Sequence, residues 1–195
     1  MQRTSNINRN TKETKVDITL DLDGSGKNSI STQIPFLDHM ISLFSVHGFF
    51  DISIDAEGDI DVDFHHTVED VGIVLGNCID KALGNRNGIR RYGHAVTPMD
   101  EALTSVSIDL SKRPFLVFNV PEIKDVSTGF NVYLAKEFLR AFAYNGKMNL
   151  HINVQYGENE HHIIESIFKS LGKALDHAVS FDKRIKVVLS SKGIL

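Results

Sequence analysis

HHTVEDVGIVLG at residues 65–76 and HHIIESIFKSLG at residues 161–172 are two copies of one pattern. They share two adjacent histidines, a glutamate, a leucine and a glycine in the same register, 96 positions apart. The register continues beyond the quoted residues, because Asp80 matches Asp176 at the same offset. Self-similarity at a fixed offset indicates a duplicated structural unit.

A second match lies upstream of each copy, at an offset of 98. It relates the segment around Gly48 to the segment around Gly146. In this register His39 falls opposite Glu137, and both residue types are possible metal ligands. The core pattern of a helix does not require that coincidence, so the duplication is expected to include a functional site.

The composition describes one ordinary soluble domain. A chain of 195 residues can bury a core without disulfides, and its single cysteine excludes a four-thiolate zinc site. The absence of a long apolar run and of a signal-peptide core favours a cytoplasmic protein with no membrane partner. The formal net charge of −4 argues against nucleic acid as a partner. We expect a single domain over residues 1–195, built from two repeats at approximately 1–95 and 96–195.

Hydrophobic periodicity predicts the same order of elements in both halves, and hence an α/β (α+β) fold class. Residues 1–12 are polar and predict a flexible start. Residues 16–22 alternate as a half-buried strand does, and residues 29–34 are its expected hairpin partner. The other strands are expected at 50–56, 99–111, 115–120 and 148–157. Helices are expected at 36–48, 63–84, 133–146 and 161–179.

The two histidine pairs indicate two metal ions. Residues four apart share a helix face, so His65 can approach the same ion as Glu69, and His161 the same ion as Glu165. The second histidine of each pair points about 100° away and cannot easily reach that ion. The most symmetric arrangement gives one ion His65, Glu69, His162 and Glu137, and the other His161, Glu165, His66 and His39. Imidazole and carboxylate ligands suit manganese, iron or zinc, and octahedral sites favour manganese or iron.

Simpler explanations exist for parts of this pattern. A lone histidine pair is common at the surface of a helix start, and the helix dipole favours first-turn acids such as Glu69 and Glu165. Neither explains why the pair is duplicated in register. His47 either approaches the site or caps its helix. We expect structural or surface roles for His94, His151 and His177, and a core position for Cys78.

Several cations could hold a phosphate. Arg91 follows a glycine-bounded turn, Arg113 precedes a proline, and Lys169 lies one helical turn beyond Glu165. The segment SSKG at 190–193 adds hydroxyls, a lysine and backbone amides. Arginine binds phosphate through paired hydrogen bonds, and lysine supplies a point charge. Each cation alone is more simply explained as a solvated surface charge, and only Lys169 is tied by spacing to the metal ligands.

Seven motifs follow one another along the chain: FLDHM, HHTVEDVGI, GIRRYGH, PMDEAL, SKRPF, HHIIESIFK and SSKG. From about residue 3 to the C-terminus, the sequence therefore resembles the imidazoleglycerol-phosphate dehydratases of histidine biosynthesis. The resemblance implies internally duplicated half-domains, each a four-stranded sheet with two helices packed on it, as in the ribosomal protein S5 domain 2-like fold. It further implies two Mn²⁺ per active site and a homo-oligomer, expected to be a 24-mer, with active sites between subunits.

The resemblance also implies site residues. The metal ligands it implies are His39, His65, His66, Glu69, Glu137, His161, His162 and Glu165. The substrate contacts it implies are Glu13, His39, His47, His65, Glu69, Arg91, Arg113, Lys169, Ser191, Lys192 and Gly193. Family members carry histidine or glutamate at the position of Glu137, so this chain keeps a competent ligand with one more negative charge. Glu165 is the candidate catalytic base, and Glu13 and Asp100 are candidates for the acid or proton relay.

The implied reaction dehydrates D-erythro-imidazoleglycerol phosphate to imidazole acetol phosphate and water. The dinuclear manganese site would bind the substrate imidazole as imidazolate, which accepts electron density as an unactivated carbon loses its proton. Two other functions use the same residues. A dinuclear metallohydrolase acting on a phosphoester would release inorganic phosphate. A metal-storage or scaffold shell would use the histidines only to join subunits, and would not require Arg91 or Lys192.

Overall fold

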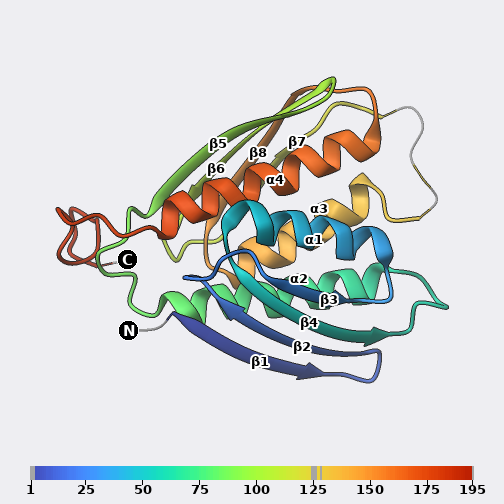
Figure 1. Cartoon of the computed structure of the whole chain (residues 1–195), viewed down its shortest axis with the longest axis horizontal. Coiled ribbons are helices and arrows are strands. Elements are labelled where there is room, and N and C mark those ends of the chain that lie inside the picture. The colour runs from blue at the N-terminus through green and yellow to red at the C-terminus, as the bar shows by residue number, and fades with distance from the viewer. Residues whose placement is uncertain (1–2, 124–126, 128, 195) are drawn as a thin grey trace.

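The computed structural model describes residues 3–123, 127 and 129–194, and in this part of the chain two four-stranded sheets enclose four helices (Figure 1). The strands of the first sheet are β1 (Thr4–Asn10), β2 (Thr14–Asp21), β3 (Asn28–Ser31) and β4 (Asp51–Gly58). Those of the second are β5 (Tyr92–Met99), β6 (Ala102–Asp109), β7 (Phe115–Asn119) and β8 (Asn149–Tyr156). The helices are α1 (Pro35–Gly48), α2 (His65–Leu83), α3 (Val132–Asn145) and α4 (Glu160–Val179).

The two sheets have the same topology. The strand orders are β1-β2-β4-β3 and β5-β6-β8-β7. The last strand of each order runs parallel to its neighbour, because a helix, α1 or α3, separates the two in the chain. The hairpins match as well, since Asn10 pairs with Lys15, and Pro98 with Leu103, 88 positions later. These features confirm the predicted fold class and the duplication; β5 begins the second sheet at Tyr92, shortly before the expected boundary at 95–96.

Two expectations for the N-terminal segment are wrong. Residues 4–10 form the edge strand β1, which pairs with β2 along its whole length. The outer face of an edge strand meets water, so its polar side chains resemble those of a flexible segment. β1, and not the segment 29–34, is therefore the hairpin partner of β2. β3 lies at the other edge of the sheet, parallel to β4.

The strand expected over residues 99–111 is also divided differently. Met99 ends β5, and Asp100 and Glu101 form the turn between β5 and β6, where Asp100 adopts a left-handed φ of 46°. β5, over Tyr92–Met99, was not predicted, because its burial alternates only weakly. α2 begins at His65, two residues later than expected. The histidine pair is thus the first turn of that helix.

The helices pair across the two halves of the chain. α1 packs on α4 and α2 packs on α3, while α2 also covers the first sheet and α4 the second. A Cβ atom at Gly76 would lie 2.6 Å from Phe142 O, and one at Gly172 would lie 2.6 Å from Phe44 O. These two glycines close the duplicated segment, and each lets two helix backbones meet.

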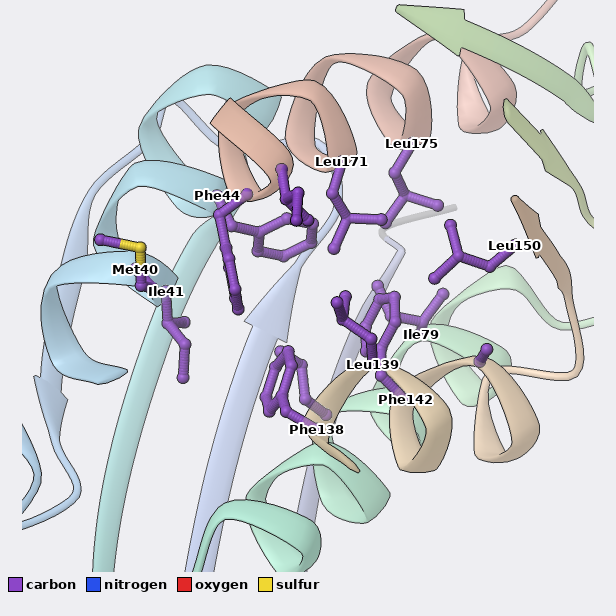
Figure 2. Packing of buried hydrophobic residues seen from close by; sticks show 14 of the residues in the cluster. Met40, Ile41, Phe44, Ile79, Phe138, Leu139, Phe142, Leu150, Leu171 and Leu175 are labelled. Carbon is purple, nitrogen blue, oxygen red and sulfur yellow. The ribbon is translucent and has the colours of Figure 1, made fainter. Parts of the chain in front are cut away.

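The core lies between the paired helices and the sheets. Phe44, Phe138, Phe142 and Leu171, drawn in Figure 2, are at most 1% exposed. Phe138 and Phe142 stack with ring centroids 6.0 Å apart. Complete burial of one such side chain contributes about 1.5–3 kcal/mol to stability. Contacts between the two halves are therefore a main source of the stability of the fold. None of the described helices combines the length and the apolar character needed to cross a membrane.

Candidate metal and substrate site

Three predicted ligands meet where α1 crosses the start of α4. His161 Nε2 lies 3.1 Å from Glu165 Oε2, and His39 Nε2 lies 3.7 Å from the same oxygen. His39, His161 and Glu165 are the one group of at least three possible ligands within 4.8 Å of one another in the described part of the chain. The i, i+4 spacing on α4 and the α1–α4 packing bring them together. We call these residues the first cluster.

Glu165 is the buried member of the first cluster. Its carboxylate accepts from Lys169 Nζ at 2.6 Å. Burial opposes ionisation, but the hydrogen bond and charge of Lys169, with His161 and His39, outweigh it and lower the pKa of Glu165. The carboxylate is thus ionised at neutral pH, as a metal ligand or a general base must be.

A repeat-related group, the second cluster, lies where α2 packs on α3. His65 Nε2 is 3.7 Å from Glu69 Oε2. Arg140 lies 3.8 Å from Glu69 and forms an ion pair with Glu137. The ion pair is made by Glu137 Oε2, a buried oxygen, so a metal ion bound by Glu137 would have to share this carboxylate with the guanidinium of Arg140. Arg140 thus lies between the carboxylates of Glu69 and Glu137 and offsets part of their negative charge.

The second histidine of each pair points away from its own cluster. The rings of His65 and His66 meet at 89°, and those of His161 and His162 at 80°. His66 instead lies against Asp59 and Glu13, whose charges and hydrogen bonds raise its pKa, the bond to Asp59 most of all. The predicted divergence is confirmed, and the chain by itself brings neither His66 nor His162 to a cluster.

His162 has an equivalent environment in the second half. Its Nδ1 lies 2.6 Å from Glu101 Oε2, and its Nε2 lies 3.7 Å from Asp100. The bond to Glu101 is the main cause of the raised pKa of His162. Backbone amides, chiefly that of Asn159, and His162 lower the pKa of Glu101 to about 2. Asp100 is therefore at the histidine pair, as its candidate catalytic role requires.

The donor set of the two clusters fits a hard or borderline divalent cation. The first cluster offers two imidazoles and one carboxylate, and the second offers one imidazole and two carboxylates. The one cysteine, Cys78, is buried on α2, and burial raises the pKa of its thiol to about 11. Nitrogen and oxygen ligands without thiolate are suited to manganese or iron.

Most of the predicted phosphate ligands lie at the opposite end of α4. Arg91 donates to both carboxylate oxygens of Asp109 and to Leu189 O, and Arg113 lies 4.0 Å from Asp109. A pocket of about 570 Å³ is lined by Arg91, Ser191 and the segment between 184 and 190. Lys192 and Gly193 follow it directly and are exposed. The structure thus groups the two arginines with the C-terminal segment.

The metal ligands and this cationic group are far apart in one chain. The amide of Arg91 donates to Ala178 O, near the end of α4, whereas His161 stands in its first turn. A helix rises 1.5 Å per residue, so the two groups are separated by about 25 Å. Lys169 and His47 lie nearer the first cluster than the Arg91 group does. Burial lowers the pKa of His47, and the positive charge of Lys169 lowers it further.

The motifs, the sheet topology and the paired clusters agree with one family. A family model described as imidazoleglycerol-phosphate dehydratase matches residues 32–175. The imidazoleglycerol-phosphate dehydratase of Desulfosudis oleivorans is 65% identical over 195 residues, with 100% of both chains covered. That of Syntrophobacter fumaroxidans is 56% identical over 194 residues, covering 100% of this chain and 98% of the relative. This chain belongs to the imidazoleglycerol-phosphate dehydratase family.

Solved structures of imidazoleglycerol-phosphate dehydratases have the same fold. The Staphylococcus aureus enzyme matches with a TM-score of 0.82 and 35% identity, over 92% of this chain and 99% of that one. The Pyrococcus furiosus enzyme, in complex with (S)-C348, matches with a TM-score of 0.85 and 39% identity, over 97% of this chain and 100% of that one. The chain is accordingly a dehydratase of histidine biosynthesis, a hydro-lyase.

Asp59, Asp109 and Arg140 were not predicted as site residues of this dehydratase, and Glu101 lies in the PMDEAL motif without a predicted role. Arg140 stands three residues after Glu137, a helical spacing that could have revealed the pair. Asp59, Glu101 and Asp109 contact site residues through turns and strand ends. No local spacing predicts such contacts, because they depend on how separate elements meet.

Proposed function

We propose that this chain dehydrates D-erythro-imidazoleglycerol phosphate to imidazole acetol phosphate, using two Mn²⁺ per active site. The observation that carries the proposal is the pair of repeat-related clusters. His39, His161 and Glu165 form one, and His65, Glu69 and Glu137 form the other. Two clusters of nitrogen and oxygen donors are what a dinuclear site needs. When bound, the metals would supply Lewis acidity that draws electron density from the substrate imidazole.

The residues of the chain would handle the proton and the hydroxyl. Glu165 is the ionised, buried member of the first cluster, and it is the candidate base. Glu13 and Asp100 remain the candidates for the acid or the proton relay. Both are exposed carboxylates beside the second histidine of a pair, 3.9 Å from His66 and 3.7 Å from His162 respectively. Exposure leaves each of them free to meet a substrate.

The cationic groups would bind the phosphate and orient the three-carbon chain. Arg91 is held by Asp109, so its guanidinium is fixed before any ligand arrives. Arg113, Ser191, Lys192 and Gly193 extend the same surface toward the C-terminus. A preformed anchor remote from the reacting carbon reduces the entropic part of the barrier.

The separation of about 25 Å along α4 supports a site built from more than one copy of the chain. The substrate, an imidazole ring with a three-carbon phosphorylated chain, cannot span that distance. A second copy would have to bring its Arg91 group to the metal ligands. His66 and His162, which contact Asp59 and Glu101 and not the glutamate of their own cluster, are similarly placed to serve another copy. This favours a homo-oligomer, for which the family resemblance implies a 24-mer; a cytoplasmic location stays a prediction.

The decisive experiment incubates the purified protein with imidazoleglycerol phosphate and Mn²⁺, and follows ketone and free phosphate together. A dehydratase forms the ketone and leaves the phosphate bound in the product. A phosphoester hydrolase releases inorganic phosphate without ketone. A storage or scaffold shell produces neither, and either of these last two results would contradict the proposal. Metal-free protein prepared with a chelator is the control.

A further inference from the structure

The second histidine of each pair is held at one particular nitrogen. His162 Nδ1 lies 2.6 Å from Glu101 Oε2. His66 Nδ1 lies 3.1 Å from both carboxylate oxygens of Asp59. The other site histidines show the opposite geometry, because His39, His65 and His161 direct Nε2 at the glutamate of their own cluster.

Holding Nδ1 has a defined chemical consequence. A neutral imidazole that donates Nδ1–H to a carboxylate carries its free lone pair on Nε2, the far side of the ring. Such a carboxylate also fixes the ring orientation and raises its basicity as a ligand. The side chains of His66 and His162 remain 36% and 26% exposed, so another molecule can reach them. Nε2 of His162 lies 3.7 Å from the exposed carboxylate of Asp100, which is beyond hydrogen-bond distance.

The holding carboxylates come from different places in the two halves. Hairpin pairing recurs 88 positions later, so Glu101 is the repeat partner of Glu13. Glu101 holds His162 at 2.6 Å, whereas Glu13 is 3.9 Å from His66, and Asp59 takes over the contact. The two halves thus hold the histidine ring in the same way with different carboxylates, and Glu13 does not take part in holding His66.

Glu101 is itself anchored. Its Oε1 accepts from the amides of Glu158 and Asn159, and its Oε2 from His162. Asp59 has a simpler role, because its carboxylate accepts only from His66 among the described residues. A carboxylate fixed by two amides cannot follow the histidine ring, so the ring must take the orientation that Glu101 sets.

We propose that Glu101 and Asp59 are positioning residues, which hold His162 and His66 with Nε2 free and aimed outward to complete the metal sites of a neighbouring copy. The inference rests on the proposed metal site. Neither carboxylate binds metal or substrate itself. Each acts through its histidine, so its loss should weaken metal binding without removing any ligand.

The test measures Mn²⁺ binding to Glu101→Gln and Asp59→Asn by electron paramagnetic resonance of the free ion. Glutamine retains an acceptor for the backbone amides but offers the ring no carboxylate. We expect wild-type protein to bind two Mn²⁺ per chain, and each variant to lose about 10- to 100-fold in affinity. Glu158→Gln and Asp61→Asn remove a nearby exposed charge, and both should bind Mn²⁺ as the wild type does.

The second readout is the ring tautomer in metal-free protein carrying ¹⁵N-labelled histidine. Long-range ¹H–¹⁵N spectra should place the proton of His162 on Nδ1 in the wild type, and should show it redistributed in Glu101→Gln. A purely structural role would lower the melting temperature and leave the tautomer unchanged. If Glu101→Gln fails to fold, Asp59→Asn with His66 decides the question.

The outcomes separate this inference from the proposed function. Wild-type affinity in both variants, beside a wild type that binds two Mn²⁺, overturns the positioning role alone. A wild type that binds no Mn²⁺ overturns the metal site, and the positioning role with it.

Discussion

At the scale of single residues, the site depends on the difference between one step and four steps along a helix. Four steps return to the same face, so His65 meets Glu69, and His161 meets Glu165. One step turns the side chain about 100°, and His66 and His162 accordingly contact hairpin and turn residues instead. The two adjacent histidines of each pair therefore contact different parts of the structure.

Glu165→Gln should abolish turnover and weaken one of the two metal sites. The substitution removes the charge that His39, His161 and Lys169 share, and an amide cannot accept the proton. Loss of a general base lowers kcat by about 10²–10⁴-fold. Steady-state kinetics and metal content measured on the same sample check this. Full activity with two bound metals would show that Glu165 has neither role, and Glu158→Gln is the matched control.

At the scale of elements, the glycine that closes each copy of the repeat sets how near two helices can come. α4 meets α1 at Gly172, and α2 meets α3 at Gly76. The local sequence identifies the glycine as shared by the two copies. Only the packing explains why the residue is glycine, because a Cβ atom at this position would clash with backbone atoms from the other half of the chain.

Gly172→Ala should destabilise the protein. The new Cβ would lie 2.6 Å from Phe44 O and 3.0 Å from Gly48 N, so α1 and α4 would have to separate. Such overpacking costs about 1–3 kcal/mol, more than the ~1 kcal/mol that alanine gains in helix propensity. Urea unfolding measures the change. Gly129→Ala, where a Cβ meets nothing within 4 Å, should be near neutral, and equal stability of both variants would refute the packing argument.

Asn159→Ala should cost about 1 kcal/mol of stability and also weaken metal binding. Asn159 caps α4 by accepting from the amides of His161 and His162, so it fixes the turn that carries both ligands. Asn131→Ala is the matched control, since Asn131 caps α3 in the same way and accepts from the amides of Tyr133 and Leu134 and not from those of the histidine pair. Thermal melts and Mn²⁺ titration should show equal destabilisation but weaker binding only for Asn159→Ala. Unchanged Mn²⁺ affinity in Asn159→Ala would show that the helix cap does not contribute to metal binding.

At the scale of the whole molecule, the duplication produces one body whose halves cannot be separated. Each helix of one half packs on a helix of the other, and the two clusters form at these two contacts. The first cluster takes His39 from the first half, and His161 and Glu165 from the second. The second cluster takes Glu137 from the second half, and His65 and Glu69 from the first.

Removal of metal should reduce the size of the assembly. If His66 and His162 complete sites on neighbouring copies, the ions join subunits, and a chelator releases that connection. Size-exclusion chromatography with light scattering, before and after EDTA, should show a smaller species that reassembles on addition of Mn²⁺. An unaltered elution volume after complete loss of metal would contradict metal-linked assembly.

The repeat register, the long helices and the i, i+4 ligand pairs could be predicted from the sequence, because each depends on spacing within one element. The chain order of strands and helices also predicted the α/β class. β1 could not be predicted, since an edge strand buries too little to leave an apolar pattern. The parallel pairing of β3 with β4 depends on how α1 crosses the sheet.

The same division holds for the candidate site. The repeat register alone places His39 opposite Glu137, but it does not reveal Arg140 beside Glu137, or Glu101 at His162. Those contacts join residues whose side chains meet only when the chain folds. The duplication can be recognised in the sequence because matched positions keep the same residue types. The contact partner of each side chain cannot be recognised there, because packing in three dimensions determines it.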